Sequence, residues 1–214
     1  MSDLVDGIHL TFETNSMLAT KIFQDTTHLY TLSTDKHGST TSLLVAGTDT
    51  LIAKMERKEL FPDTVAFPGS QLNNGKAKQV KKWLRPTLVA EGVRAYTIEM
   101  TPGNFFLLRH PQYRLALYTP DLQEIIAHWL VETKDSPLRL VIASDTEKAA
   151  FPQIIAAFVY EEQNMRVVEK HDIVAGRTPA FRVRVDYPFL GMLPHTGEVN
   201  LAALAGSRQG NAWQ

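Results

Sequence analysis

The sequence predicts a mainly β fold in which antiparallel strands close into a barrel around one hydrophobic helix. Period-two alternation of apolar and polar residues recurs along most of the chain, as expected for strands with one buried face. Residues 149–160, AAFPQIIAAFVY, form an uncharged run that stops at Glu161 and Glu162. A long series of hairpins exposes strand edges unless it closes, and closure into a barrel removes those edges. The helix would then fill the interior of the barrel.

The first strand illustrates the pattern that defines the others. Ile8, Leu10 and Phe12 share one face, and polar residues alternate with them on the other. Segments rich in turn-forming residues, such as 35–38 and 101–103, separate the strands. Further strands are predicted at residues 18–23, 27–33, 40–46, 50–57, 64–67, 87–90, 93–100, 104–109, 112–118, 124–132 and 138–143.

The apolar run predicts a buried helix near residues 147–165. Residues 154–160 have no polar face, and a helix that is hydrophobic all round belongs in a core. Pro152 suits the first helical position, where an N–H group would have no partner within the helix. A buried strand is the alternative, because IIAAFVY is also rich in β-forming residues. Glu161 and Glu162 are interpreted as the point where the helix reaches solvent.

We divide the chain into a barrel domain, residues 1–166, and a C-terminal extension, residues 167–214. Apolar and basic residues alternate at 181–187, FRVRVDY, which predicts one strand in the extension. Residues 188–214 contain several Gly and Pro residues and end in a polar tail, for which we expect a mobile end.

Composition restricts the classes of function. The chain of 214 residues is 44% hydrophobic and 21% charged, as in ordinary globular proteins. Its 22 basic and 23 acidic side chains nearly cancel, so no general attraction to nucleic acid is expected. The sequence contains no cysteine, which excludes disulfides, thiol nucleophiles and cysteine-ligated zinc.

No motif assigns a catalytic residue, a metal site or a cofactor. The seven histidines lack metal-ligand spacing, and His128 is expected to be a neutral histidine buried in a strand. Gly69-Ser70 lacks the second glycine of a nucleophile elbow, and phosphate-binding loops do not occur. The N-terminus has no signal-peptide pattern, which predicts an intracellular protein. The apolar run at 149–160 is well short of the roughly 20 residues that a transmembrane helix needs, so none is expected.

Several segments follow one another in a recognisable order: LTF, DTLIAKMERKE, DTVAF, KQVKKWLRP, GVRAYTIE and LRLVIAS, before the apolar helix. This order, over residues 8–166, resembles a fungal domain of unknown function in the tubby C-terminal-like superfamily, beside LURP-one-like and scramblase-like barrels. The resemblance implies a closed barrel of about 12 strands around a hydrophobic helix. The sequence departs from the pattern after Tyr96, where Ile98 stands in place of a second aromatic residue. The resemblance carries over no catalytic residue.

The strongest local charge is a basic cluster that we define as Lys76, Lys78, Lys81, Lys82, Trp83 and Arg85. Its five cations lie within ten residues that contain no acid. Tubby-type barrels are associated with phosphoinositide headgroups, and each cation close to an anionic membrane contributes about 1 kcal/mol. Trp83 would then lie at the membrane interface. The alternative is a solvated basic loop or short helix in which Val80 and Trp83 pack on the barrel.

These features favour a non-enzymatic binding or scaffold module that contacts an anionic phospholipid through the basic cluster. The second hypothesis is a module for protein interaction or self-association that uses residues 167–214. An enzyme of unrecognised mechanism is the third. The oligomeric state stays open under each hypothesis.

Overall fold

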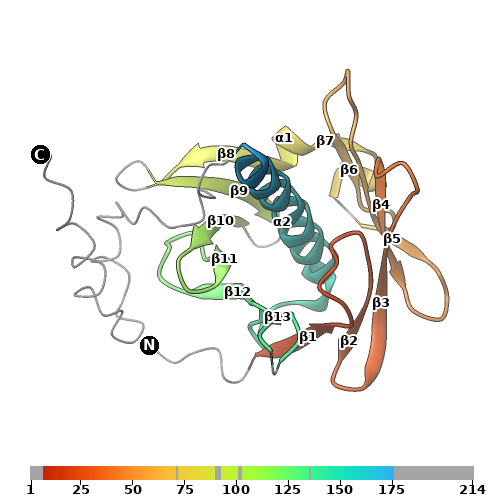
Figure 1. Cartoon of the computed structure of the whole chain (residues 1–214). Coiled ribbons are helices and arrows are strands. Elements are labelled where there is room, and N and C mark those ends of the chain that lie inside the picture. Colours follow the sequence, from red (N-terminus) through yellow and green to blue (C-terminus); the bar gives the residue numbers. More distant parts are fainter. Residues whose placement is uncertain (1–6, 71, 90–92, 101–102, 135, 176–214) are drawn as a thin grey trace, which may run out of the picture.

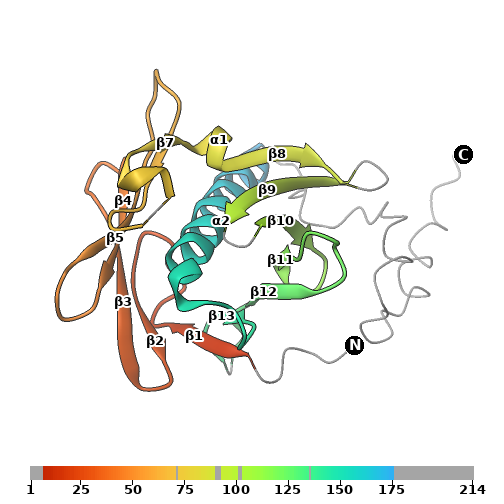
Figure 2. The ribbon, with the colours of Figure 1, turned by 180° about the vertical axis from the view of Figure 1, so that it is seen from behind.

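In the part of the chain that the structure describes, thirteen antiparallel strands form one sheet that curves around a long C-terminal helix (Figures 1 and 2). The computed structural model describes residues 7–70, 72–89, 93–100, 103–134 and 136–175. The strands are β1 (Ile8–Phe12), β2 (Ala19–Gln24), β3 (Thr27–Thr34), β4 (Thr40–Val45), β5 (Leu51–Glu56), β6 (Thr64–Ala66), β7 (Lys78–Gln79), β8 (Leu84–Leu88), β9 (Arg94–Met100), β10 (Gly103–His110), β11 (Arg114–Tyr118), β12 (Ile125–Leu130) and β13 (Arg139–Ile142).

The sheet is a meander whose two arms meet at β1 and β13. Its order is β7-β6-β5-β4-β3-β2-β1-β13-β12-β11-β10-β9-β8. Within each arm, strands that follow one another in sequence pair with one another, as the hairpin pattern predicts. The ladder between β1 and β13, in which Ile8 lies opposite Ile142, joins the two arms. The mainly β class is therefore confirmed.

The predicted closure into a barrel is wrong. β7 and β8 are the two ends of the sheet, and in the described part of the chain no ladder joins them. The four-residue helix α1 (Val80–Trp83) connects them instead (Figure 2). Its first backbone N–H donates to the carbonyl of Asp63 at 2.8 Å, and the side chains of Val80 and Trp83 are buried. The chain thus passes between the two edges as a helix rather than as paired strands.

Pro86 is a second physical reason why the edge of β8 stays open. The backbone N–H of Val89 donates to the carbonyl of Val93 at 2.9 Å, which extends the ladder between β8 and β9. Backbone groups alternate in direction along a strand, so the nitrogen of Pro86, three residues earlier, faces away from β9. Proline has no N–H and cannot donate to a strand on that side.

The predicted buried helix is confirmed as α2 (Phe151–Val174), which a short 3-10 turn (Lys148–Ala150) precedes. Pro152 lies in its first turn, as predicted, and every residue from Ile154 to Val159 is at most 1% exposed. The alternative of a buried strand is therefore excluded. α2 continues nine residues beyond position 165, where we expected its end. The strand predicted at 181–187 and the rest of the extension from residue 176 lie outside the described residues.

The main core lies between the inner face of the sheet and α2. Trp129 makes edge-to-face contacts with Phe12 and with Phe158 of α2, at ring-centroid distances of 5.1 and 5.4 Å. A second apolar cluster occupies the opposite face of strands β9 to β12, because alternate residues such as Leu107 and Leu108 point to different sides. The interior of the curved sheet is thus filled by side chains, and the residues that a ligand contacts must be sought at its edges and outer surface.

Candidate functional site

The basic cluster lies on α1 and the strands on either side of it. Residues 80 and 83 are three positions apart, so they share one side of α1, and both are buried. The ring of Trp83 packs on Phe67 with 5.3 Å between centroids. Trp83 is 1% exposed, so it anchors α1 to the core and presents no surface to a ligand. This placement matches the alternative in which Val80 and Trp83 pack against the fold.

Four of the five cations are exposed, and the fifth is partly covered. Lys76, Lys81, Lys82 and Arg85 are exposed, whereas the side chain of Lys78 is 25% exposed and its Nζ lies 3.7 Å from Glu99. Among the residues that the structure describes, no acidic side chain pairs with Lys81, Lys82 or Arg85. The structure therefore leaves positive charge on the outer side of α1 and the first residues of β8.

The same cations border the open edge of the sheet. Leu84 is buried and Arg85, the next residue of β8, is exposed. Charged side chains and proline on an edge strand hinder pairing with other chains. The position of Arg85 and Pro86 on β8 is thus suited to protection of this open edge.

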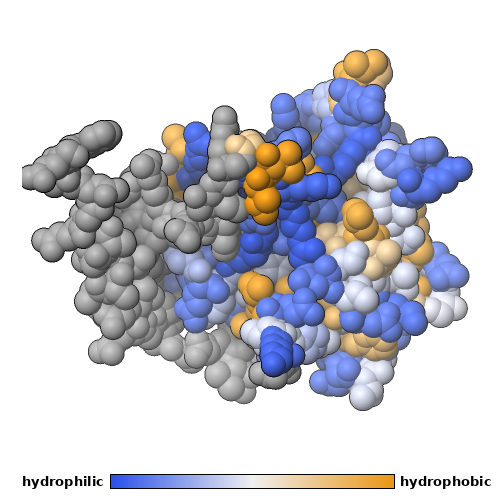
Figure 3. Space-filling model, viewed as in Figure 1, coloured by the Kyte–Doolittle hydropathy of each residue, from blue (hydrophilic) through white to orange (hydrophobic). Residues whose placement is uncertain are grey.

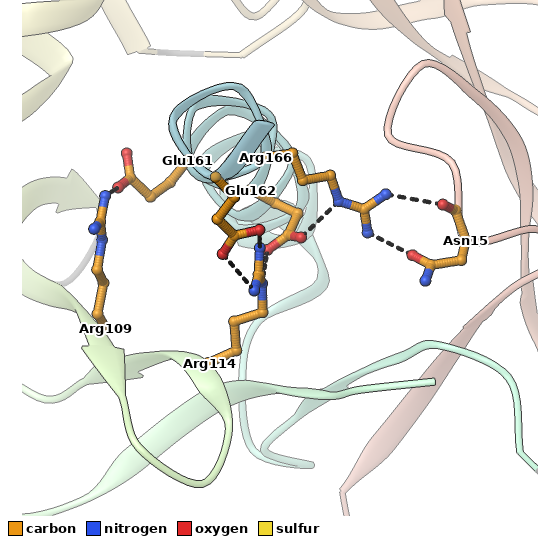
Figure 4. Close-up of polar contacts among 7 residues, drawn as sticks. Asn15, Arg109, Arg114, Glu161, Glu162 and Arg166 are labelled. Carbon is orange, nitrogen blue, oxygen red and sulfur yellow. Dashed lines mark hydrogen bonds and ion pairs between the residues drawn. The ribbon is translucent and has the colours of Figure 1, made fainter. Parts of the chain in front are cut away.

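A second concentration of charge joins α2 to the strands (Figure 4). The two oxygens of Glu162 accept hydrogen bonds from Nε of Arg114 and Nε of Arg166, both at 2.7 Å. Arg114 also donates to Glu169 at 2.9 Å, and Arg166 binds Asn15 in the segment between β1 and β2. These contacts fix the second half of α2 to β11 and to the start of the chain.

The interpretation of Glu161 and Glu162 as the point where the helix reaches solvent is wrong. The two residues are 1% and 3% exposed. Burial raises the pKa of Glu161, and Arg109, whose guanidinium lies 3.2 Å away, partly opposes this shift. The pair between Glu162 and Arg166 has helical i,i+4 spacing that the sequence shows, but Arg109 and Arg114 lie 52 and 48 residues from their partners. No local pattern identifies such distant pairs.

Two histidines form an aromatic group on the outer face of β10 to β12. His128 is buried, as predicted, and the ring of Tyr113 packs on the rings of both His128 and His110, with centroid distances of 4.1 and 4.8 Å. Nδ1 of His110 accepts the backbone N–H groups of Gln112 and Tyr113, both at 3.2 Å. Nδ1 can accept these bonds only while it carries no proton. His110 thus stabilises the turn between β10 and β11 in its neutral form.

We expect His110 to make the fold sensitive to acid. Burial, and to a lesser extent the nearby His128, lower the pKa of His110 from 6.5 to about 4. A base whose pKa is lowered by folding stabilises the fold fully above the unfolded pKa and loses that contribution as pH falls through the folded pKa. The loss between pH 6.5 and about 4 is worth about 3 kcal/mol. Urea unfolding of wild type and of His110→Asn, which keeps a hydrogen-bond acceptor, measures this loss. The free energy of unfolding of wild type should fall relative to that of the variant as pH falls. A pH-independent difference would contradict this role.

Two further searches concern metals and membranes. Within the described ranges, no three His, Asp or Glu side chains come together as a metal-binding group. In the part of the chain that the structure covers, no helix is both long and apolar enough to cross a membrane.

A comparison with known protein families matches most of the chain. The model of a family described as being of unknown function, DUF6593, matches residues 15–167, which include all strands from β2 to β13 and the first two thirds of α2. No curated protein and no solved structure matches the chain.

Proposed function

The chain belongs to this family of unknown function, and from its own residues we propose that it is a binding or scaffold module that contacts anionic lipid headgroups. The observation that carries the proposal is the outer side of α1 and β8, where Lys81, Lys82 and Arg85 are exposed beside buried Val80 and Trp83. The core holds the backbone of these cations in place. The backbone therefore loses little conformational entropy on binding, which favours association.

The cations differ in what they contribute to this contact. Lys81, Lys82 and Arg85 are the main candidates, Lys76 is exposed beside them, and Lys78 is already close to Glu99. At about 1 kcal/mol for each cation near an anionic surface, the three main cations provide about 3 kcal/mol. Such a contact is modest and strongly weakened by salt.

The wider classification belongs to the same proposal. Kinship with fungal members of the tubby C-terminal-like superfamily rests on the order of segments, which includes the KQVKKWLRP stretch that forms β7, α1 and the start of β8. The proposal also includes an intracellular location, because anionic lipids are concentrated in the leaflet that faces the cytoplasm.

We expect wild-type protein to float with vesicles that contain phosphoinositides at low salt and to be released at high salt. Lys81→Glu combined with Lys82→Glu should abolish flotation, because it turns attraction into repulsion. Lys134→Glu with Lys148→Glu is the matched control: it changes the charge equally at two exposed lysines outside the basic cluster. Absence of flotation of wild type at low salt, or an equal loss in both double variants, would refute the proposal.

A second candidate is an interaction or self-association module. Val167, Val168, Ile173 and Val174, in the last turns of α2, are 47–80% exposed and belong to the first part of the C-terminal extension. Large exposed apolar side chains that gather at one place are typical of contact surfaces. An oligomer in solution that dissociates when residues 188–214 are deleted would favour this candidate.

A further inference from the structure

We propose that Leu60 and Phe61 insert into the lipid bilayer as an apolar wedge beside the basic cluster. The inference deepens the proposed lipid contact and rests on it. It assigns the nonpolar part of membrane binding to the segment between β5 and β6, residues 57–63, which the sequence patterns do not single out.

The tip of this segment exposes two adjacent large apolar side chains. Leu60 is 89% exposed and Phe61 is 71% exposed. In Figure 3, which has the view of Figure 1, hydrophobic surface lies at the top of the molecule, where the segment between β5 and β6 projects. Hydrophilic surface borders it. Full burial of such a side chain in an apolar environment changes a binding constant by about one to two orders of magnitude. Transfer of Leu60 and Phe61 from water to a nonpolar environment would therefore strengthen binding substantially.

The base of the segment is held firmly while its tip projects. The side chain of Asp63 accepts the backbone N–H of Lys58 at 3.0 Å and the hydroxyl of Tyr160, on α2, at 2.8 Å. Arg57 donates to Gln163 and Asn164 of α2, both at 3.0 Å. Both ends of the segment are thus attached to the central helix.

The same base lies directly against α1. The carbonyl of Asp63 accepts the N–H of Val80, the first residue of α1. Both ribbon views place the segment between β5 and β6 and helix α1 at the same end of the molecule (Figures 1 and 2). Lys81 and Lys82 directly follow Val80 in α1. A backbone hydrogen bond therefore links the helix of these lysines to the segment that carries Leu60 and Phe61.

Charge and size favour a bilayer over a protein as the occupant. The exposed Lys81, Lys82 and Arg85 outnumber Glu59, the exposed acid of the segment, which suits an anionic surface. A tip of two residues is small beside the roughly 800 Å² per partner of a stable protein interface. A bilayer accepts a small wedge, and membrane binding commonly combines a weak apolar anchor with basic residues.

The chain has no cysteine, so one introduced cysteine can carry an environment-sensitive fluorophore. We would label Phe61→Cys with nitrobenzoxadiazole. The control is Thr26→Cys, an exposed site in the turn between β2 and β3, at the opposite end of the molecule (Figures 1 and 2). With vesicles of phosphatidylcholine, phosphatidylserine and phosphoinositide, emission at position 61 should rise and shift to shorter wavelength, and emission at position 26 should not change. Phosphatidylcholine alone should leave both probes unchanged.

Affinity provides the second readout. Leu60→Ser with Phe61→Ser should weaken vesicle binding about tenfold or more and leave stability nearly unchanged, because both side chains are exposed. Unchanged emission at position 61, while flotation still depends on Lys81 and Lys82, would refute the wedge and leave the proposed function intact. Absence of vesicle binding by wild type would refute both. A drop in oligomeric mass in the serine variant would assign the tip to a second copy of the chain and also refute the wedge.

Discussion

Replacement of Ala157 by aspartate is expected to prevent folding. Ala157 is 0% exposed and lies in the middle of the stretch of α2 that the sheet surrounds. A carboxyl group at this position would be buried without a hydrogen-bonding or ionic partner. Its burial costs several kcal/mol of folding free energy, whether the group stays charged or takes up a proton. Domains of this kind are stable by about 5–15 kcal/mol, so the cost removes much or all of their stability. Circular dichroism and solubility measure the result.

Val168→Asp is the matched control for this variant. It introduces the same side chain in place of an apolar residue on the same helix, but at a position that is 47% exposed. We expect a loss of about 1 kcal/mol or less, because the side chain at this position stays in contact with water. A cooperative melt of Ala157→Asp close to that of Val168→Asp would contradict the central position of α2.

Arg114→Met is expected to destabilise the protein by about 3–5 kcal/mol, because it leaves Glu162 buried with one of its two arginine partners missing. The side chains of Arg114 and Glu162 are 14% and 3% exposed. Arg114 also adopts a φ of 64°, a conformation that costs a non-glycine residue about 1–2 kcal/mol and that methionine would keep. Urea unfolding followed by the fluorescence of the buried Trp83 and Trp129 measures the loss.

A double-mutant cycle shows whether the loss belongs to the ion pair. Glu162→Met combined with Arg114→Met should be less destabilising than the sum of the single changes, because no buried charge of this pair is left alone. Lys21→Met is the exposed control: its pair with Glu13 spans 3.9 Å with both side chains about half exposed, and it should change stability by less than about 1 kcal/mol. Equal effects of Arg114→Met and Lys21→Met would contradict the role of the buried network.

Local patterns were sufficient for most strands of the sheet. The hydrophobic pattern predicts β1 to β6 and β9 to β13 within a few residues of their observed bounds, although β11 to β13 are buried on both faces. It misses β7, which has only two residues and no room for a repeat. It places the start of β8 three residues late, because Arg85 and Pro86 interrupt the apolar pattern there.

The candidate site was predictable only in part. Five cations within ten residues identify the basic cluster, but only the fold shows that Trp83 is buried and Lys78 lies near Glu99. The apolar tip at Leu60 and Phe61 has no sequence signature, since apolar residues next to a strand usually enter the core. Exposure distinguishes the two cases, and exposure follows from packing with distant segments.

The sequence by itself determined which segments become strands, that one helix is buried and where positive charge is concentrated. These properties depend on neighbours along the chain, through periodicity and turn residues. The tertiary structure alone decided that α1 separates the ends of the sheet, that Glu161 and Glu162 pair with distant arginines, and that Leu60 and Phe61 face solvent next to α1. Each of these outcomes depends on contacts between residues far apart in sequence, and local sequence patterns do not predict such contacts.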